Sequence, residues 1–574
     1  MGLEELLNDA GGLGRFQIVN LFIFYLGKLF SGWSMFQMTF AGIVPDFLCE
    51  RSTSDDVLDL EALSLNLTSN RCYIPLNASD LSLGKIECVA YNYTSPYKTV
   101  MKDFDLVCGR DWIKPTLISI QMAGLMLGSI VAGQLGDVLG RWKSNLIFVI
   151  ILCLGNMAAA FSPGWEVFAV FRCVIGVGIG GIMVVSFTQP IEFMPKKWRP
   201  VVSCTPAWAL GVTIFSFTAY LLQDWRKMHF VTGASGILQI PLLFLVPESL
   251  RWLATQGRID QAEVVIDKVA KWNGKPPVPH ARATLEDVYS EQKQAEEKSQ
   301  RYTYMSILRP WSTAKITLIM FYHWFCYSLS YYGISFGVSD LAGNFFLNVL
   351  LLGLIDTPPL LLTLYTNNKI GRKWTALIFI IVAVSGAVAC MTIIFTGEGG
   401  KGSVMVTTLS LIARTGVSVS WYVMQTWGNE LYPTVIRNLG YGAANTTARV
   451  AGILAPFIID FKTRMTESYV LIVVLLAIDL VLILLLSDTK GITLSDTIAG
   501  AKGKEPEVNE KSGQELKSVA NIKAKSSGVR MKEKSSEKFA DTKGSLDIQN
   551  EIKGLNNQEK GYQYGESGFT DIRL

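Results

Sequence analysis

Charged side chains are scarce in this sequence. Only 17% of its 574 residues are Asp, Glu, Lys or Arg, against roughly a quarter in an average soluble domain, so a soluble protein is disfavoured. The net charge of +4 is too small to indicate a nucleic-acid partner. Three histidines and nine scattered cysteines leave little for a metal site. No nucleophile with its base and no phosphate-binding glycine loop of proper spacing appears, so we expect no enzyme activity, no cofactor and no metal.

Apolar residues take the place of the missing charges. They make up half of the chain, and uncharged runs recur that are long enough to cross a hydrocarbon core of about 30 Å. The sequence therefore predicts a polytopic membrane protein. We expect twelve spans, at residues 17–44, 115–136, 144–163, 166–192, 201–223, 228–247, 313–335, 345–367, 374–396, 403–428, 438–459 and 467–487.

Basic residues predict the orientation of these spans, because Lys and Arg accumulate in short cytoplasmic loops. The loops after spans 2, 4, 8 and 10 carry nine of them, whereas the loops on the other side carry five. The link at 248–312 adds ten more to the first side. Residues 1–16 lack a small-residue cleavage site, so we expect the first span to be retained and both termini to be cytoplasmic.

A polar insert at residues 45–114 separates the first two spans. It contains four cysteines and three glycosylation sequons, on the side that the topology places outside the cell. We therefore expect a glycosylated extracellular loop closed by disulfides, although four cysteines allow three pairings and the sequence does not choose between them. The cysteines are Cys49, Cys72, Cys88 and Cys108, and the sequon asparagines are Asn66, Asn77 and Asn92.

The end of the chain, 488–574, is rich in Lys, Glu, Ser and Gly, and its large apolar residues are sparse. Such a segment cannot bury a core, so we expect cytoplasmic disorder. The last residues, Phe569–Leu574, end on an apolar carboxylate that can add to the edge of a PDZ-type sheet, although an ordinary disordered end is the commoner case.

The short loops repeat between the two halves of the chain. A glycine-arginine signature follows span 2 at 133–143 and span 8 at 367–373. An acid and an arginine seven residues apart follow spans 4 and 10, and the stretch 247–252 after span 6 has a weaker echo at 487–491. Anchoring at the membrane surface would explain one isolated motif, but the paired recurrence favours ion pairs that latch a cytoplasmic gate. The gating candidates are Asp137, Arg141, Glu192, Arg199, Arg372, Glu430 and Arg437.

These motifs resemble those of the major facilitator superfamily and, within it, the organic cation, organic anion and carnitine transporter family. The resemblance covers residues 1 to about 497. It is carried by the opening 11–17, the large cysteine and sequon loop, and the stretches 133–143, 247–252 and 429–440. It implies an all-α membrane protein whose twelve helices form two pseudo-symmetric six-helix halves, 17–247 and 313–487. It also implies movement of small organic ions across the plasma membrane by alternating access.

Several ionisable residues lie near the middle of predicted spans, where a charge costs at least about 2.5 to 3.5 kcal/mol unless it faces water or a partner. Arg172 and Arg414 occupy comparable places in the two halves, so we assign them mainly to structure or coupling. The unmatched residues are Lys28, Asp356, Arg449 and Asp479. Asp479 is assigned mainly to helix packing, because in the related family the twelfth span usually stands outside the central cavity.

Arg449 is a substrate-binding candidate, because a guanidinium can fork onto a carboxylate. In the related family, cation-selective members tend to carry an acid at this place, whereas anion and carnitine members tend to carry Arg. Asp356 can attract an ammonium, and together the two charges would suit a zwitterion. Lys28 departs from the family pattern and either favours anions or neutralises Asp356. The alternative for these charges is a permanent intramembrane salt bridge, with each other or through Lys28 and Asp479.

Aromatic residues of spans 7 and 10 can wall the cavity and offer cation-π surface, although packing is the commoner role at helical spacing. Tyr331 and Tyr332 resemble the family's Tyr-Tyr-Gly stretch, and Trp421 and Gln425 are candidates in the same cavity. His323 can titrate with pH, but a lone histidine is more often a satisfied polar residue.

Together these residues predict a secondary transporter of small organic ions. Asp356 and the aromatic residues favour organic cations or amine-bearing, carnitine-like zwitterions, while Arg449 and Lys28 favour organic anions as the alternative. A receptor that binds without transport, using the glycosylated loop and the tail, is a remote third interpretation. The expected partners are the small organic ion and the lipid bilayer, with no nucleic acid.

Overall fold

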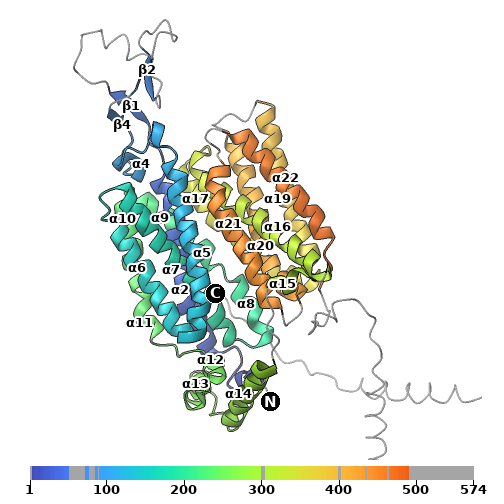
Figure 1. Cartoon of the computed structure of the whole chain (residues 1–574). Coiled ribbons are helices and arrows are strands. Elements are labelled where there is room, and N and C mark those ends of the chain that lie inside the picture. The colour runs from blue at the N-terminus through green and yellow to red at the C-terminus, as the bar shows by residue number, and fades with distance from the viewer. Residues whose placement is uncertain are drawn as a thin grey trace, which may run out of the picture. The chain divides into compact units, whose positions relative to one another are not determined.

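Helices form nearly all of the computed structural model of this chain. It describes residues 3–50, 72–75, 85–87, 90–298, 304–309, 311–397, 403–432, 436–459, 461 and 464–489. They fall within one compact unit, Met1–Gly503. Figure 1 shows two bundles of helices within it, with short strands near one end of the first bundle and a small group of helices near the other. The segment 490–574, predicted to be disordered, lies outside the described residues.

The first bundle covers the first six predicted spans. Two of its helices are interrupted, so that α8 continues as α9 and α10 continues as α11. Its helices are α2 (Arg15–Ala41), α5 (Ile113–Leu139), α6 (Arg141–Ala159), α7 (Trp165–Glu192), α8 (Arg199–Cys204), α9 (Ala207–Leu222), α10 (Trp225–Ile237) and α11 (Gln239–Leu243), with short 3-10 turns η1 (Cys108–Arg110) and η2 (Lys196–Trp198).

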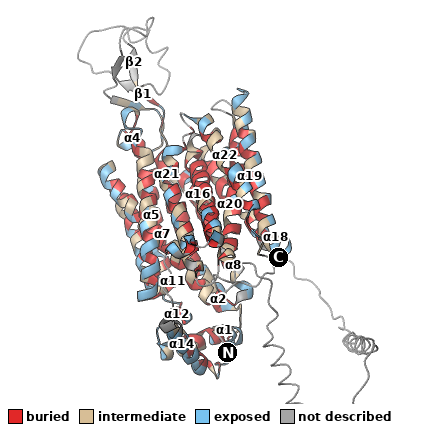
Figure 2. Cartoon of the chain, turned by 45° about the vertical axis from the view of Figure 1, so that its right-hand side comes forward, coloured by how far each residue is buried: buried red, intermediate tan, exposed pale blue. Residues whose placement is uncertain are grey.

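The second bundle covers the last six predicted spans, and one of its spans is divided into α17 and α18. Its elements are α15 (Tyr304–Leu308), α16 (Trp311–Phe336), η3 (Gly337–Asp340), α17 (Phe345–Leu354), α18 (Thr357–Lys369), α19 (Arg372–Phe395), α20 (Val404–Leu431), α21 (Arg437–Ile458) and α22 (Met465–Leu484). In both bundles the buried residues concentrate between the helices, as the red segments of Figure 2 show.

Eight helical segments in the described part of the chain are long and apolar enough to cross a bilayer, and they match predicted spans 1–4, 8–10 and 12. The other four predicted spans coincide with α9, with α10 and α11, and with α16 and α21. The first two are short or interrupted, whereas α16 and α21 are long but carry many polar residues. Helices therefore occupy all twelve predicted positions, as the predicted fold requires.

Prolines explain two of the interruptions. Thr205 is extended, as expected of a residue that precedes a proline, and Pro206 starts the new helix α9. Pro358 and Pro359 stand in the first turn of α18, where a missing backbone N–H costs little. This second break leaves Asp356 at the turn between α17 and α18, in the interior of the second bundle.

Glycines at equivalent turns support the predicted repeat between the bundles. Gly140, between α5 and α6, has φ +101°, and Gly371, between α18 and α19, has φ +113°, a conformation that suits glycine alone. A Cβ atom at Gly140 would collide with the carboxylate of Glu248, and one at Gly371 with the carboxylate of Asp488. Each turn therefore receives an acid from the end of the last span of its own bundle.

The link after the first bundle forms α12 (Leu250–Thr255), α13 (Ile259–Trp272) and α14 (Ala281–Lys298), which pack with the N-terminal α1 (Leu3–Asp9). Asn273 fastens the start of the chain to this group. Its Oδ1 accepts a hydrogen bond from the Phe16 N–H at 3.1 Å, and its Nδ2 donates to the Ala10 carbonyl at 2.8 Å. The link is thus held to the first bundle.

The insert contains two antiparallel strand pairs, β1 (Phe47–Glu50) with β4 (Ala90–Tyr93), and β2 (Tyr73–Pro75) with β3 (Lys85–Glu87), followed by α4 (Val100–Asp103). Cys72 and Cys108 form a disulfide, one of the pairs left open above. Asn92 is exposed on β4. The side chain of Cys49 and all of Cys88, Asn66 and Asn77 lie outside the described residues.

Candidate functional site

A cavity of about 340 Å³ lies between the two bundles. Helices α2, α7 and α9 of the first bundle and α16, α20 and α21 of the second bundle line it. Six of the seven predicted substrate-binding residues face it, namely Lys28, Tyr331, Tyr332, Trp421, Gln425 and Arg449. We call this cavity the central pocket.

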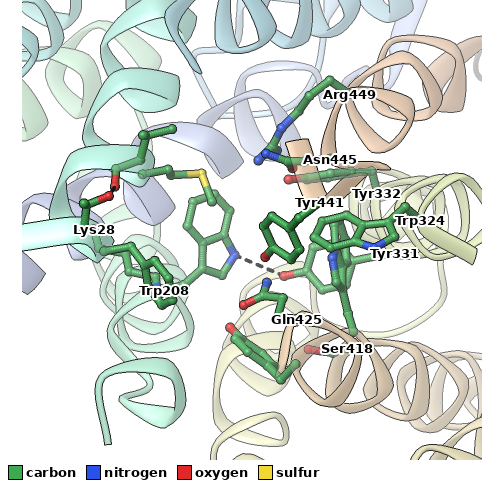
Figure 3. A pocket seen from close by; sticks show the side chains of 16 residues that line it. Lys28, Trp208, Trp324, Tyr331, Tyr332, Ser418, Gln425, Tyr441, Asn445 and Arg449 are labelled. Atoms are coloured by element: carbon green, nitrogen blue, oxygen red, sulfur yellow. Dashed lines mark hydrogen bonds between the residues drawn. The ribbon is translucent and has the colours of Figure 1, made fainter. Parts of the chain in front are cut away.

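Two cationic side chains reach the central pocket from opposite bundles, Lys28 from α2 and Arg449 from α21 (Figure 3). Arg449 interacts with the Tyr332 hydroxyl, and its Nε has no hydrogen-bond partner among the described residues. Asn445 and Tyr441 precede Arg449 at intervals of four residues, which places all three on one face of α21. That face carries the polar groups that can hold a carboxylate.

Aromatic rings form much of the pocket wall. Trp208 donates a hydrogen bond from its indole nitrogen to the Tyr331 hydroxyl at 3.1 Å, which joins the two bundles (dashed line in Figure 3). Trp421 packs edge-on against three rings of α16, at centroid distances of 5.8 to 6.2 Å. The aromatic side chains that line the pocket are Phe187, Trp208, Trp324, Tyr331, Tyr332, Trp421, Tyr422 and Tyr441.

Asp356, the seventh predicted residue, does not line this pocket. Its carboxylate lies 2.9 Å from Nη1 of Arg414 and accepts a hydrogen bond from the Ser418 hydroxyl at 3.0 Å. Asp356 is 5% exposed and Arg414 is 1% exposed. The sequence predicted a clamp or a salt bridge between Asp356 and Arg449, but the acid instead pairs with the arginine that was assigned to structure.

The other buried charges have partners away from the central pocket. Asp479 pairs with His323, whose Nδ1 lies 2.6 Å from Oδ1 of the carboxylate. Arg172 donates a hydrogen bond to the side-chain oxygen of Gln121. Among the pocket-lining residues that the structure describes, none is Asp or Glu.

Asp137, Arg141 and Glu192 of the first bundle form one network. It lies at the end of the bundle where the link 248–312 begins, which we call the link side; the opposite end, at the insert 45–114, is the insert side. The Arg141 guanidinium lies 2.7 Å from Asp137 and 3.2 Å from Glu192. The Ser249 hydroxyl donates to Glu192, and the Glu248 carboxylate accepts from the Arg141 backbone N–H at 2.8 Å. Arg199, the other gating candidate of this loop, donates to the Met194 carbonyl at 3.2 Å.

The second bundle repeats this network. Arg372 lies 3.0 Å from Glu430, and the Thr489 hydroxyl donates to the same carboxylate. Arg437 contacts the Tyr432 carbonyl at 3.5 Å. Thr489 and Ser249 make equivalent hydrogen bonds, each to the glutamate of its own bundle. The stretch that resembles 247–252 after span 12 thus makes the same contact as its equivalent after span 6. Each of these ion pairs joins helices of one bundle and does not reach across to the other.

Contacts between the bundles gather on the insert side of the central pocket. The Ser119 hydroxyl donates to the Ile453 carbonyl, and the Ser216 hydroxyl to the Phe346 carbonyl, both at 2.6 Å. On the opposite side, the pocket-lining Thr188 and Gln425 lie close to the link-side ends of α7 and α20. The bundles are therefore hydrogen-bonded to each other on the insert side of the pocket, and the pocket extends toward the link side.

Sequence reasoning missed several lining residues, among them Trp208, Ser418, Tyr441 and Asn445. Two of them could have been predicted from helical spacing. Tyr441 and Asn445 precede Arg449 by eight and four residues, so all three lie on one face of the helix. Trp208 carried no such signal, because its span holds no other candidate.

The chain matches the profile of the family described as "Sugar (and other) transporter" over residues 20–497. Organic cation/carnitine transporter 2 of Homo sapiens is 29% identical over 444 residues, which cover 73% of this chain and 75% of that protein. Organic anion transporter 3 of Mus musculus is 28% identical over 469 residues, covering 80% and 86%. The solved structure of the proton:xylose symporter XylE bound to 6-bromo-6-deoxy-D-glucose covers 85% of this chain and 99% of its own, with a TM-score of 0.60 and 16% identity, a likeness of fold.

Proposed function

The chain belongs to the sugar (and other) transporter family of the major facilitator superfamily, within its organic cation, organic anion and carnitine branch, and on that premise we propose that it carries small organic anions. It is a multi-pass membrane transporter, and its matched relatives are transporters and not enzymes. Because those relatives are named for cations, carnitine and anions, the substrate class has to be argued from the pocket.

The charge of the central pocket carries the proposal. Lys28 and Arg449 both line it, and the described lining residues include no carboxylate. A substrate with a net positive charge would face two like charges, and such juxtaposition is unfavourable. A carboxylate would offset one of these two positive charges, and the Arg449 guanidinium offers donors in a fork that matches its two oxygens.

The volume and the lining of the central pocket restrict the part of the substrate beyond its carboxylate. A volume of about 340 Å³ is at the small end of ligand pockets. The surrounding aromatic rings suit an apolar or aromatic body, while Asn445 and Gln425 offer hydrogen bonds for one or two polar groups. A small aromatic carboxylate meets all of these conditions.

Carboxylate-bearing zwitterions are the second candidate class, and the aromatic wall favours them. A quaternary ammonium is attracted to the faces of Trp and Tyr rings, so a betaine can place its carboxylate on Arg449 and its ammonium against Trp421 or Tyr331. Organic cations without a carboxylate lose their main support, because Asp356 is occupied by Arg414.

We further propose that the transporter works by alternating access in the plasma membrane, with the insert outside and both termini in the cytoplasm. The uneven distribution of basic residues supports this orientation. In it, the central pocket extends toward the cytoplasm. Removal of N-linked glycans should increase the gel mobility of the protein from intact cells, and Asn92→Gln should reduce that shift. A chain whose insert stays protected from external enzymes would contradict the orientation.

The carboxyl-terminal residues Phe569–Leu574 remain a proposed ligand of a PDZ-type domain, and they lie outside the described residues. Adding one glycine after Leu574 removes the terminal carboxylate from its expected place and should shorten the residence of the transporter at the cell surface. An unchanged residence time would argue against such a partner.

Uptake of three labelled probes tests the substrate class: hippurate, glycine betaine and tetraethylammonium. We expect hippurate to enter cells that express the wild type. Arg449→Gln should weaken its apparent affinity by about 10- to 100-fold, because a charge-assisted hydrogen bond contributes about 1.5 to 3 kcal/mol. Lys28→Gln should act in the same direction. Arg464→Gln and Lys315→Gln are controls, since neither residue lines the central pocket.

Each alternative has its own result. Betaine uptake that requires Arg449 would establish the zwitterion class. Tetraethylammonium uptake that is insensitive to Arg449→Gln and Lys28→Gln would overturn the anion proposal. Saturable binding of hippurate without accumulation would support the remote receptor interpretation.

A further inference from the structure

A histidine and an aspartate are paired inside the second bundle, outside the central pocket. Nδ1 of His323, on α16, lies 2.6 Å from Oδ1 of Asp479, on α22. The two residues are 1% and 0% exposed. Neither lines the pocket, and the proposed binding of substrate makes no use of them.

The surroundings of this pair supply no compensating charge. In the described part of the chain, Asp479 forms a salt bridge only with His323. The titratable neighbours of Asp479 on α16 are Tyr322, Cys326 and Tyr327. The Tyr327 ring lies 3.8 Å from the imidazole, centroid to centroid.

Among the described residues, the helices packed around α16 and α22 form no other ion pair with His323 or Asp479. The charged residues of helix α19 are Arg372 and Lys373, both at its link-side end. Helix α20 contributes Ser420 near Tyr327, and its buried Arg414 is bound to Asp356. The buried charge of α21 is Arg449, which faces the central pocket.

The His323–Asp479 pair is neutral in sum only when it holds one proton. When one proton is added to a neutral imidazole and a carboxylate, the pair is either an imidazolium–carboxylate ion pair or two neutral groups. Without that proton, a net negative charge stays in an apolar interior, which is costly. Nε2 of His323 and Oδ2 of Asp479 have no hydrogen-bond partner among the described residues, and the Tyr327 hydroxyl lies near both Asp479 and Ser420.

Helix α16 connects the pair to the central pocket. Trp324 follows His323 in the chain and lines the pocket, as do Tyr331 and Tyr332 further along the same helix. A change in how α16 packs on α22 therefore moves pocket residues. The converse also holds, because a substrate that displaces these rings alters the contact between His323 and Asp479.

We propose that His323 and Asp479 form a proton-binding site, distinct from the central pocket, through which a proton moves together with the substrate. The site takes its proton from water in one access state, holds it between imidazole and carboxylate, and returns it to water in the other state. The inference goes beyond the proposed substrate class, since it applies to whichever organic ion the pocket carries.

Uptake of labelled hippurate under an imposed pH gradient, with the outside more acidic, tests this site. We expect the gradient to raise wild-type accumulation and a protonophore to abolish the increase. With one proton per substrate, a gradient of about one pH unit sustains up to about tenfold accumulation. His323→Gln and Asp479→Asn should retain uptake without a gradient and lose the response to it. If hippurate is not carried, the same test applies to the betaine or tetraethylammonium probe that enters, so the substrate class and the proton site are judged separately.

His229→Gln is the matched control. His229 is also a fully buried histidine, but its Nδ1 faces the side-chain oxygen of Asn156 at 3.1 Å and no carboxylate. This variant should keep the gradient response. Asp479→Glu preserves a carboxylate and should keep a reduced response if Asp479→Asn fails to reach the membrane. A wild-type protein indifferent to the gradient, or an unaltered response in His323→Gln, would overturn the proposal.

Discussion

The carboxylate of Asp356 and the guanidinium of Arg414 form an ion pair at 2.9 Å behind the wall of the central pocket. Nη2 of Arg414 also donates to the Tyr331 hydroxyl at 2.8 Å, and Tyr331 lines the pocket. The pair therefore fixes the position of a wall residue and supplies no charge to the substrate. It also joins the break between α17 and α18 to α20, because Asp356 stands at that break.

Replacing Asp356 with Asn should cost about 3 to 5 kcal/mol of folding free energy, because the buried Arg414 loses its counter-charge. We expect much less mature protein at the cell surface and a lower melting temperature in detergent. The double variant Asp356→Asn, Arg414→Gln should recover part of the loss, since both charges are then absent. Normal abundance combined with a selective loss of cation uptake would return Asp356 to a substrate-binding role.

Glu192→Gln should slow transport while leaving the apparent substrate affinity unchanged. The carboxylate is 9% exposed and joins Arg141 to Ser249, so its loss should cost about 1.5 to 3 kcal/mol in whichever state contains the network. Asp137→Asn is the matched control, since Asp137 bonds the same arginine but is 75% exposed, where an ion pair contributes about 0 to 1 kcal/mol. Initial uptake rates at several substrate concentrations separate the two effects, and equal effects of both variants would contradict the burial argument.

Gly353→Ala should weaken closure on the insert side. A Cβ at this position would lie 2.6 Å from the Ala209 carbonyl oxygen and would collide with the Thr213 hydroxyl, so α17 and α9 would have to separate. We expect slower uptake and faster labelling of a cysteine introduced at Ser216 by a thiol reagent that cannot cross the membrane. Gly442→Ala, on α21, is the control, because nothing lies within 4 Å of its added Cβ. Labelling that is the same in both variants would show that the close approach is not needed for closure.

Removal of the Cys72–Cys108 disulfide should destabilise the insert by about 2 to 5 kcal/mol. The cysteines are 36 residues apart, so the bond restricts a long loop of the unfolded chain. A mild reductant should lower the melting temperature of the wild type and have a smaller effect on Cys72→Ser. An identical response of both proteins would assign the sensitivity to another bond.

The positions of the helices and six of the pocket-lining residues could be predicted from the sequence, because they depend on properties that are local in the chain. Apolar length predicts where a span lies, and the recurring glycine turns at Gly140 and Gly371 indicate the repeat. Polar residues near the middle of apolar spans are costly to expose to lipid, so they are expected to face a cavity or a partner. This reasoning brought Lys28, Gln425 and Arg449 to one pocket.

Partners across helices could not be predicted, because they depend on how each helix is rotated about its axis. Asp356 and Arg414 lie on different spans, and only the interruption at α17 turns the acid toward α20. Glu192 likewise binds Arg141 of the preceding loop and not Arg199 of its own. Spacing within a loop says little about contacts that tertiary packing creates.

The attachment of the link through Asn273 has a mechanical consequence for alternating access. Because α12, α13 and α14 are fastened to the N-terminal segment and to the first bundle, they would travel with that bundle in the proposed alternating access. In the described part of the chain, the first bundle carries α12, α13 and α14 beyond its end (Figure 1), and immobilising these helices would hold that bundle still.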